Sequence, residues 1–330
     1  MFFLSIYYNL IKRLQLISNT YSISQYRKWW GTGMLKKSSR YQYIGLVYLL
    51  PWLIGLLIFQ LYPFLMSFYY SLTDYNMVNS PKFIGFSNYI KIFTEDNQFV
   101  QSLKITGIYV LMAVPLKLTF ALLVAVILSA KLKGINFFRT IYYLPSILGG
   151  SVAISVLWRF LFAKDGVINS LTAKLGIPAV DWLGNPDISL FTIGLLTVWQ
   201  FGSSMVLFLA GLQQIPSELY EAASIDGASK VRIFFKVTVP LLTPIVLFNV
   251  VMQMINAFQE FTGAFVITNG GPMKSTFLYA LKVYEEAFTF FKMGYASALS
   301  WILFIIIMVI AAIIFTTSNR WVHYEDGEKR

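Results

Sequence analysis

The chain has 330 residues, of which 57% are hydrophobic and 12% are charged, with a mean hydropathy of +0.64. This composition excludes a disordered chain and predicts a protein with several membrane spans. The net charge of +11 would suit a nucleic-acid binder, but apolar segments favour lipid headgroups as its partner. There is no cysteine, and the one histidine is His323 near the end of the chain. We therefore expect no disulfide, no metal site and no histidine-based active site.

The first segment, residues 1–40, is strongly basic, and no acidic residue precedes Asp74. Residues 2–17 are too short and too interrupted to span a bilayer, and they lack a small-residue cleavage site. We expect a basic amphipathic extension on the inner membrane face. Met34-Leu35-Lys36-Lys37 also looks like a beginning, so either Met1 or Met34 could start the mature chain.

Six apolar segments follow within residues 41–321. Their approximate bounds are 44–72, 103–128, 141–162, 188–212, 239–261 and 294–315. Pro51 and Pro63 are expected to kink or shorten the first, and Gly149-Gly150-Ser151 to permit close packing or a break in the third. Basic residues cluster before the first segment, after the second and after the fourth, so these parts are predicted inside. Both termini, including a tail at 322–330, are then cytoplasmic.

A polar interruption at residues 216–236 separates the fourth and fifth segments. Pro216 suits a first helical turn, and Glu218 and Glu221 favour the positive end of the helix dipole. Leu219, Ala222 and Ala223 form a small apolar face. Gly227 permits a sharp bend, and Asp226 is expected to cap the helix that follows. On the residues alone, an ordinary helix–turn–helix loop explains this segment equally well.

The spacing of Glu221-Ala222-Ala223, Gly227 and Val237-x-Val239-Pro240 resembles the EAA loop of binding-protein-dependent ABC importer permeases. The usual closing Ile-x-Leu-Pro is Val-x-Val-Pro here. Residues 213–227 and Thr268-Asn269-Gly270-Gly271-Pro272 are similar to the sugar-importer, maltose-permease-like branch, and the resemblance spans residues 43–321.

The resemblance implies an all-α, six-span type I importer permease in the cytoplasmic membrane. Its partners would be an ATPase subunit dimer, a second and unlike permease subunit, and an external solute-binding protein. The ATPase would dock on the EAA loop, which acts as a coupling helix. The implied coupling residues are Glu218, Glu221, Ala222, Ala223, Asp226 and Gly227.

Alternatives to a transport subunit find little support. Gly270-Gly271-Pro272-Met273-Lys274-Ser275 lacks the spacing of a phosphate-binding loop, so we expect no nucleotide, cofactor or metal on this chain. An intramembrane enzyme lacks a catalytic constellation within the spans. A secondary carrier is disfavoured by the EAA loop and by the expected absence of paired broken spans.

Candidate substrate contacts lie on the fourth and fifth segments. Asn249, Gln253, Asn256 and Glu260 are spaced to line one helix face, and the fourth segment offers Trp199, Gln200, Ser203 and Ser204. These groups could be hydrogen-bonding links between helices or could line a wet cavity.

The resemblance implies a sugar site at Trp199, Gln200, Ser203, Gln253 and Glu260, to which the polar face adds Asn256. Leu196 and Ala257 replace polar groups of the maltose permease, so the same substrate is not expected. We expect a neutral di- or oligosaccharide. The alternative is an acidic oligosaccharide or glycerol phosphate, with Lys117 and Arg159 as cationic contacts. Otherwise Arg159 reaches the outer interface and Lys117 faces protein.

Overall fold

The computed structural model describes residues 48–130 and 133–323. The expected amphipathic extension at 1–40 and most of the tail at 322–330 lie outside the described residues. The chain divides into two units, Met1–Met66 and Ser67–Arg330, and each is described by itself.

The described part of the first unit, residues 48–66, is helical throughout. It contains a π-helical turn, η1 (Leu57–Leu61), and runs into α4 (Tyr62–Ser71), so that one apolar helix extends over Tyr48–Ser71. Pro63 is the second residue of α4, separated from η1 by Tyr62 alone. Because proline has no N–H to donate to the preceding turn, a widened turn there accommodates it without ending the helix. Neither proline therefore shortens this span.

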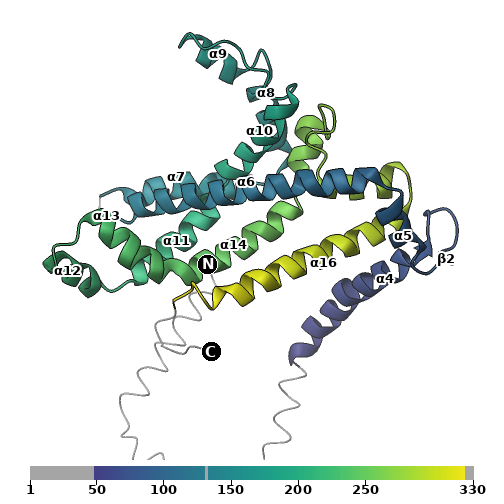
Figure 1. Cartoon of the computed structure of the whole chain (residues 1–330), viewed down its shortest axis with the longest axis horizontal. Helices are drawn as coiled ribbons and strands as arrows, with labels where there is room; N and C mark the ends of the chain where they lie inside the picture. The colour runs from purple at the N-terminus through teal and green to yellow at the C-terminus, as the bar shows by residue number, and fades with distance from the viewer. Residues whose placement is uncertain (1–47, 131–132, 324–330) are drawn as a thin grey trace, which may run out of the picture. The chain divides into compact units, whose positions relative to one another are not determined.

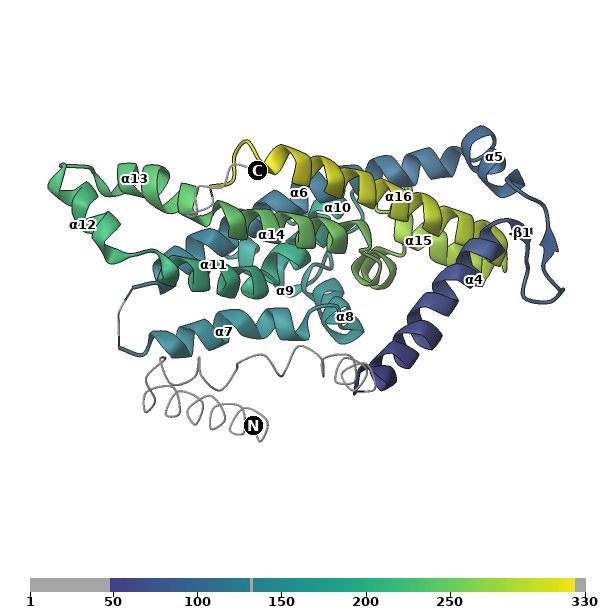
Figure 2. The same ribbon diagram turned by 90° about the horizontal axis from the view of Figure 1, so that it is seen from below.

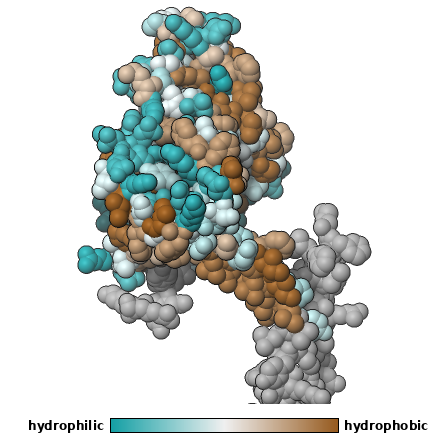
Figure 3. Space-filling model, turned by 90° about the vertical axis from the view of Figure 1, so that its right-hand side faces the viewer, coloured by the Kyte–Doolittle hydropathy of each residue, from teal (hydrophilic) through white to brown (hydrophobic). Residues whose placement is uncertain are grey.

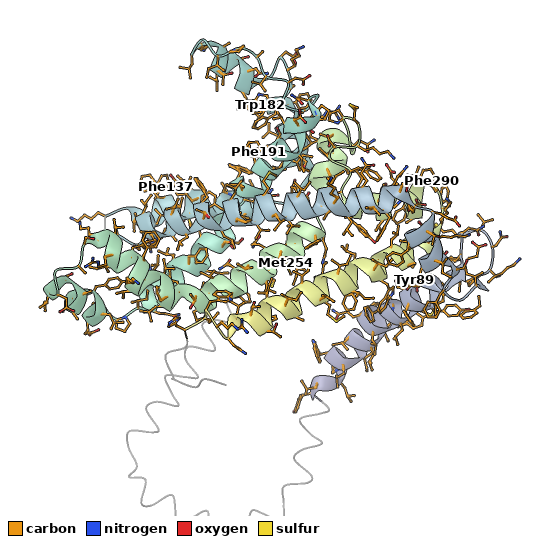
Figure 4. The ribbon with its side chains drawn as sticks, viewed as in Figure 1. Tyr89, Phe137, Trp182, Phe191, Met254 and Phe290 are labelled. Atoms are coloured by element: carbon orange, nitrogen blue, oxygen red, sulfur yellow. The ribbon has the colours of Figure 1, made fainter. Side chains whose placement is uncertain are left out.

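The second unit is built around α6 (Asn97–Leu128). The Asp96 side chain caps its amino end by accepting a hydrogen bond from the Phe99 N–H at 3.0 Å. Ala113, Ala121 and Ala125 are fully buried, which allows neighbouring helices to approach α6 closely. Those neighbours are α10 (Pro186–Trp199), α11 (Gly202–Gln214) and α14 (Val239–Phe258). Met254, labelled in Figure 4, lies buried on α14.

Two of the apolar segments are broken helices. α7 (Ile135–Leu148) and α8 (Val152–Leu161) differ in direction by 104°, and α10 and α11 by 46°. Gly150, with φ +75°, supplies the left-handed residue at the first break, as its sequence suggested. The second break, at Gln200-Phe201, was not expected. The described part of the chain thus contains two broken spans, and the sequence indicated only the one at Gly149-Gly150.

Two more long helices complete the spans: residues Lys230–Phe258, which include α14, and α16 (Met293–Ser318). Among the described residues, four helices are long and apolar enough to cross a membrane, or up to six if each bent pair counts as one span. The fold is therefore helical, as predicted, and its spans agree with six crossings.

Short elements lie at two ends of the second unit (Figures 1 and 2). One end carries α12 (Ser217–Ile225), α13 (Lys230–Ile233) and the π-helical η2 (Phe234–Thr238). The other carries an antiparallel pair, β1 (Thr73–Asp74) and β2 (Lys82–Phe83), with Thr73 opposite Phe83, and also α5 (Ser87–Thr94). The remaining short elements are α9 (Val167–Ala173), η3 (Ala264–Thr268), α15 (Tyr279–Tyr284) and η4 (Glu285–Thr289).

Candidate substrate cavity and coupling surface

A cavity of about 350 Å³ lies where α6, α14 and the two broken helices meet. Both breaks border it, because Gly149 and Gly150 come from one and Gln200 from the other. The full lining is Val114, Lys117, Ser146, Gly149, Gly150, Thr197, Gln200, Ser203, Gln253, Asn256, Ala257 and Glu260. Backbone outside regular helix is tolerated at membrane depth only where protein or a wet cavity satisfies it. The helix breaks and the polar lining therefore belong to one structural feature.

Five of the six residues predicted to bind substrate line this cavity. They are Gln200, Ser203, Gln253, Asn256 and Glu260. Their amide and hydroxyl groups make no side-chain hydrogen bond to any other described residue, apart from the Glu260 carboxylate, which accepts from the Gly263 N–H at 2.8 Å. Links between helices would require such bonds. The cavity arrangement leaves these groups available to a solute.

Trp199 is the sixth predicted residue, and it does not line the cavity. It is the last residue of α10, after which the chain turns at Gln200. Its ring instead lies beside Trp158 of α8, with ring centroids 6.0 Å apart and the planes inclined by 40°. The prediction assumed one continuous helix, and the break separates Trp199 from the surface that carries Gln200.

The polar face of the fifth segment is also divided. Gln253, Asn256 and Glu260 reach the cavity, whereas Asn249 is fully buried outside it and donates to the Ile245 carbonyl at 3.1 Å. Ser204, next to Ser203, is likewise fully buried away from the lining. Helical spacing placed these groups on one face but could not show where the cavity ends.

Several lining residues were missed or placed differently. Ser146 and Thr197 were not considered, although each is a polar residue inside an apolar segment. Lys117, for which a cationic substrate contact and a protein-facing position were both considered, lines the cavity, with only 7% of its surface exposed. Arg159 is exposed on α8 and lies outside the lining, which leaves it no contact with a solute held there.

A second, larger cavity of about 690 Å³ lies at the end of the unit that carries α5. Hydrophilic side chains gather on this face in Figure 3, and Phe290, labelled in Figure 4, is part of the lining. At its base, the Lys282 ammonium lies 2.8 Å from the Asp96 carboxylate and 3.4 Å from Glu286. We refer to these three residues as the buried ion cluster.

Asp96 also accepts a hydrogen bond from the Tyr295 hydroxyl at 2.6 Å. Burial by itself raises the pKa of the Asp96 carboxyl, but the hydrogen bonds from Lys282 and Tyr295 and the Lys282 charge outweigh it and lower the pKa below its usual value. Asp96 is therefore ionised at neutral pH, and it joins the start of α6 to α15 and α16.

The EAA loop forms the expected pair of short helices, and no residue of α12 is buried. Leu219 is 42% exposed, so the apolar face of α12 has no cover within the described residues. Gly227 has φ +73°, as the predicted bend requires. Pro216 is the N-cap and α12 begins at Ser217. The role given to Asp226 is wrong: it ends α12, and the Ser229 hydroxyl caps α13 by accepting from Arg232 N.

Comparison with known proteins settles the family. Residues 96–323 match the family model described as "Binding-protein-dependent transport system inner membrane component". The chain belongs to this family. The permease is 50% identical over 288 residues to the probable ABC transporter permease protein YesP of Bacillus subtilis, covering 86% of this chain and 93% of the relative. It is thus a translocation subunit, not an enzyme.

A second relative and a solved structure are also similar to this permease. The permease is 31% identical over 284 residues to the multiple sugar-binding transport system permease protein MsmF of Streptococcus mutans, covering 85% of this chain and 97% of the relative. Its fold matches that of a chain in the crystal structure of a bacterial ABC transporter for the acidic polysaccharide alginate. The TM-score is 0.74 at 20% identity, over 87% of this chain and 99% of the other. The predicted type I importer fold is therefore confirmed.

Proposed function

We propose that this permease subunit forms part of an ATP-driven importer that carries a sugar, a di- or oligosaccharide, across the cytoplasmic membrane by alternating access. The observation that carries the proposal is the cavity between the broken helices, where the amides of Gln200, Gln253 and Asn256 and the hydroxyl of Ser203 have no hydrogen-bond partner among the described residues. Its volume of about 350 Å³ falls within the range of small-molecule sites, roughly 300–1,000 Å³. Sugar hydroxyls would replace water as partners for these groups.

Relatives support the choice of a sugar. One is described as a multiple sugar-binding transport system permease, and another, 32% identical over 283 residues, as the lactose transport system permease LacF of Rhizobium radiobacter. The complete importer would add a second permease subunit, an ATPase dimer and an external solute-binding protein. Both chain termini and the EAA loop would face the cytoplasm, where basic loops are favoured.

The substrate site is tested by the variant Gln253→Ala. We expect sugar uptake to fall by up to about tenfold, because one neutral hydrogen bond contributes about 0.5–1.5 kcal/mol. Assembly of the importer should remain intact. Uptake into proteoliposomes and thermal unfolding are measured together, after sugars are screened for stimulation of ATP hydrolysis. Asn249→Ala is the matched control. Asn249 is on the same helix but outside the cavity, so its loss should reduce stability more than uptake.

If the wild type and Gln253→Ala take up sugar equally well, the sugar site is not in this cavity. Parallel losses of uptake and stability in Gln253→Ala would instead assign Gln253 to helix packing. If no sugar stimulates ATP hydrolysis or is taken up, the proposed function fails.

The EAA loop is tested by Gly227→Val, which is expected to uncouple ATP hydrolysis from uptake. No neighbouring atom lies within 4 Å of a Cβ added at Gly227, so the cost is not a clash. The free-energy cost comes from the backbone angle φ of +73°, which is a left-handed conformation. This conformation costs most residues roughly 1–2 kcal/mol, and it costs a β-branched residue such as valine more. The bend between α12 and α13 should shift, and fewer sugars should enter per ATP hydrolysed.

Gly227→Asn is the control for this variant, because asparagine tolerates the left-handed region. Glu221→Lys, which reverses the charge on the exposed surface of α12, should also uncouple. An unchanged ratio of uptake to hydrolysis in both Gly227→Val and Glu221→Lys would show that α12 does not transmit ATPase movement.

A further inference from the structure

Lys117 is a buried lysine whose ammonium has no hydrogen-bond or ion-pair partner in the part of the chain that the structure describes. It projects from the middle of α6, lines the cavity, and has 7% of its surface exposed. Within the described residues, the Lys117 ammonium forms neither a hydrogen bond nor an ion pair. A lysine at the centre of a span is costly, by about 2.5–3.5 kcal/mol on insertion scales, and is normally paired or placed at a solute pathway.

The only carboxylate in the cavity lining is Glu260, and it does not pair with Lys117. Its charge acts on Lys117 across the cavity. One Glu260 oxygen accepts the Gly263 N–H at 2.8 Å, which holds this carboxylate at the turn after α14. The Lys117 ammonium lines the cavity with its N–H donors unused by described residues, so they remain available to a solute. A lysine offers three such donors and no acceptor.

The rest of the lining favours a sugar with one negative charge over a more highly charged solute. Gln200, Ser203, Gln253 and Asn256 are neutral groups suited to hydroxyls. A carboxylate of charge −1 matches the single ammonium. A phosphate monoester, with a charge of about −1.5 to −2, would be repelled by the Glu260 carboxylate in the same cavity more strongly than a carboxylate of charge −1.

We propose that Lys117 binds the carboxylate of a sugar acid, so that the permease selects oligosaccharides containing a uronic acid over neutral ones. This inference rests on the proposed sugar import. Lys117 supplies one charge-assisted hydrogen bond, and the amides and hydroxyls around it hold the remaining sugar hydroxyls. Specificity arises because a neutral sugar offers the Lys117 ammonium no charge-assisted hydrogen bond, and no described protein group forms one with it either.

The test compares uptake by the complete reconstituted importer of wild type, Lys117→Gln and Lys117→Arg. The probes are uronic-acid disaccharides, their carboxyl-reduced counterparts and the matching sugar phosphates. Because the binding-protein step is the same for every variant, differences between variants belong to the permease. Lys104→Gln is the matched control, since Lys104 is on the same helix, exposed and outside the cavity. Thermal unfolding of each variant is measured in parallel.

Lys117→Gln is expected to lower uptake of the uronic-acid sugars roughly tenfold to a hundredfold, the range for a hydrogen bond to a charged group. Uptake of the carboxyl-reduced sugars should change little, Lys117→Arg should retain most activity, and Lys104→Gln should match wild type. Three results would overturn the assignment. Lys117→Gln could lower uptake of the uronic-acid sugars and of their carboxyl-reduced counterparts equally. The wild type could prefer the sugar phosphates, or the loss of uptake in Lys117→Gln could be accounted for by a loss of thermal stability.

The failure of this inference is distinct from failure of the proposed function. Import of neutral sugars alone would overturn the role of Lys117 and leave sugar import standing. Import of no probe by the wild type would overturn both.

Discussion

Replacing Lys282 by methionine is expected to lower the free energy of unfolding by about 3–5 kcal/mol, the cost of leaving buried charges without their partner. Lys282 has 2% of its side chain exposed, and its carboxylate partners, Asp96 and Glu286, have 13% and 12%. Methionine matches the length of the lysine stem but supplies no charge. Both carboxylates would stay buried without a cation, and the contact between α6 and α15 would weaken.

Chemical unfolding of the purified subunit in detergent micelles measures this effect, and Lys292→Met is its matched control. Lys292 is 63% exposed and lies 3.8 Å from Glu286 in the same cluster of charges. An exposed pair of this kind contributes only about 0–1 kcal/mol. If Lys282→Met lowers the free energy of unfolding no more than Lys292→Met does, the buried ion cluster does not hold these helices together.

Gly202→Ala is the second change with a large expected effect, because it acts on the wall of the cavity. A Cβ at Gly202 would lie 2.6 Å from the Tyr142 carbonyl oxygen and 2.8 Å from the Tyr143 Cα. Both are backbone atoms of α7, so the two helices must move apart. Overpacking of this kind costs about 1–3 kcal/mol. The movement displaces Ser146 and Gly149, and sugar uptake should fall by at least about tenfold.

Uptake and thermal unfolding of Gly202→Ala are compared with those of Gly107→Ala. Gly107 lies in α6, with no atom within 4 Å of an added Cβ. Alanine there removes the helix cost of glycine, about 1 kcal/mol, and should leave uptake unchanged. Wild-type uptake by Gly202→Ala would show that the spacing of α7 and α11 does not control the cavity.

The fold could be predicted from the sequence where apolar segments were long and uninterrupted, as in α6 and α16. The break after α7 could be suspected from Gly149-Gly150-Ser151. The break at Gln200 could not, because neither Gln200 nor Phe201 is a helix breaker. The glycine beside it, Gly202, serves close packing against α7.

Prediction of the site residues was limited in the same way, because it assumed continuous helices. Helical spacing identified Gln253, Asn256 and Glu260, since α14 is one continuous helix over most of that stretch. It misplaced Trp199, since α10 ends there. Lys282 and Asp96 are far apart in the sequence, and only the packing of α15 on α6 shows that they pair.

The two broken helices also determine the thermodynamics of filling the cavity. At each break, backbone groups lose intrahelical partners, and the surrounding lining contains only Val114 and Ala257 as apolar side chains beyond glycine. A polar cavity of this size holds water. A solute that enters exchanges one set of hydrogen bonds for another, and it also covers apolar surface, which makes up about half of the lining. Because a negative heat-capacity change reports apolar burial, binding in this cavity carries such a change, and the binding enthalpy depends on temperature even though hydrogen bonds hold the solute.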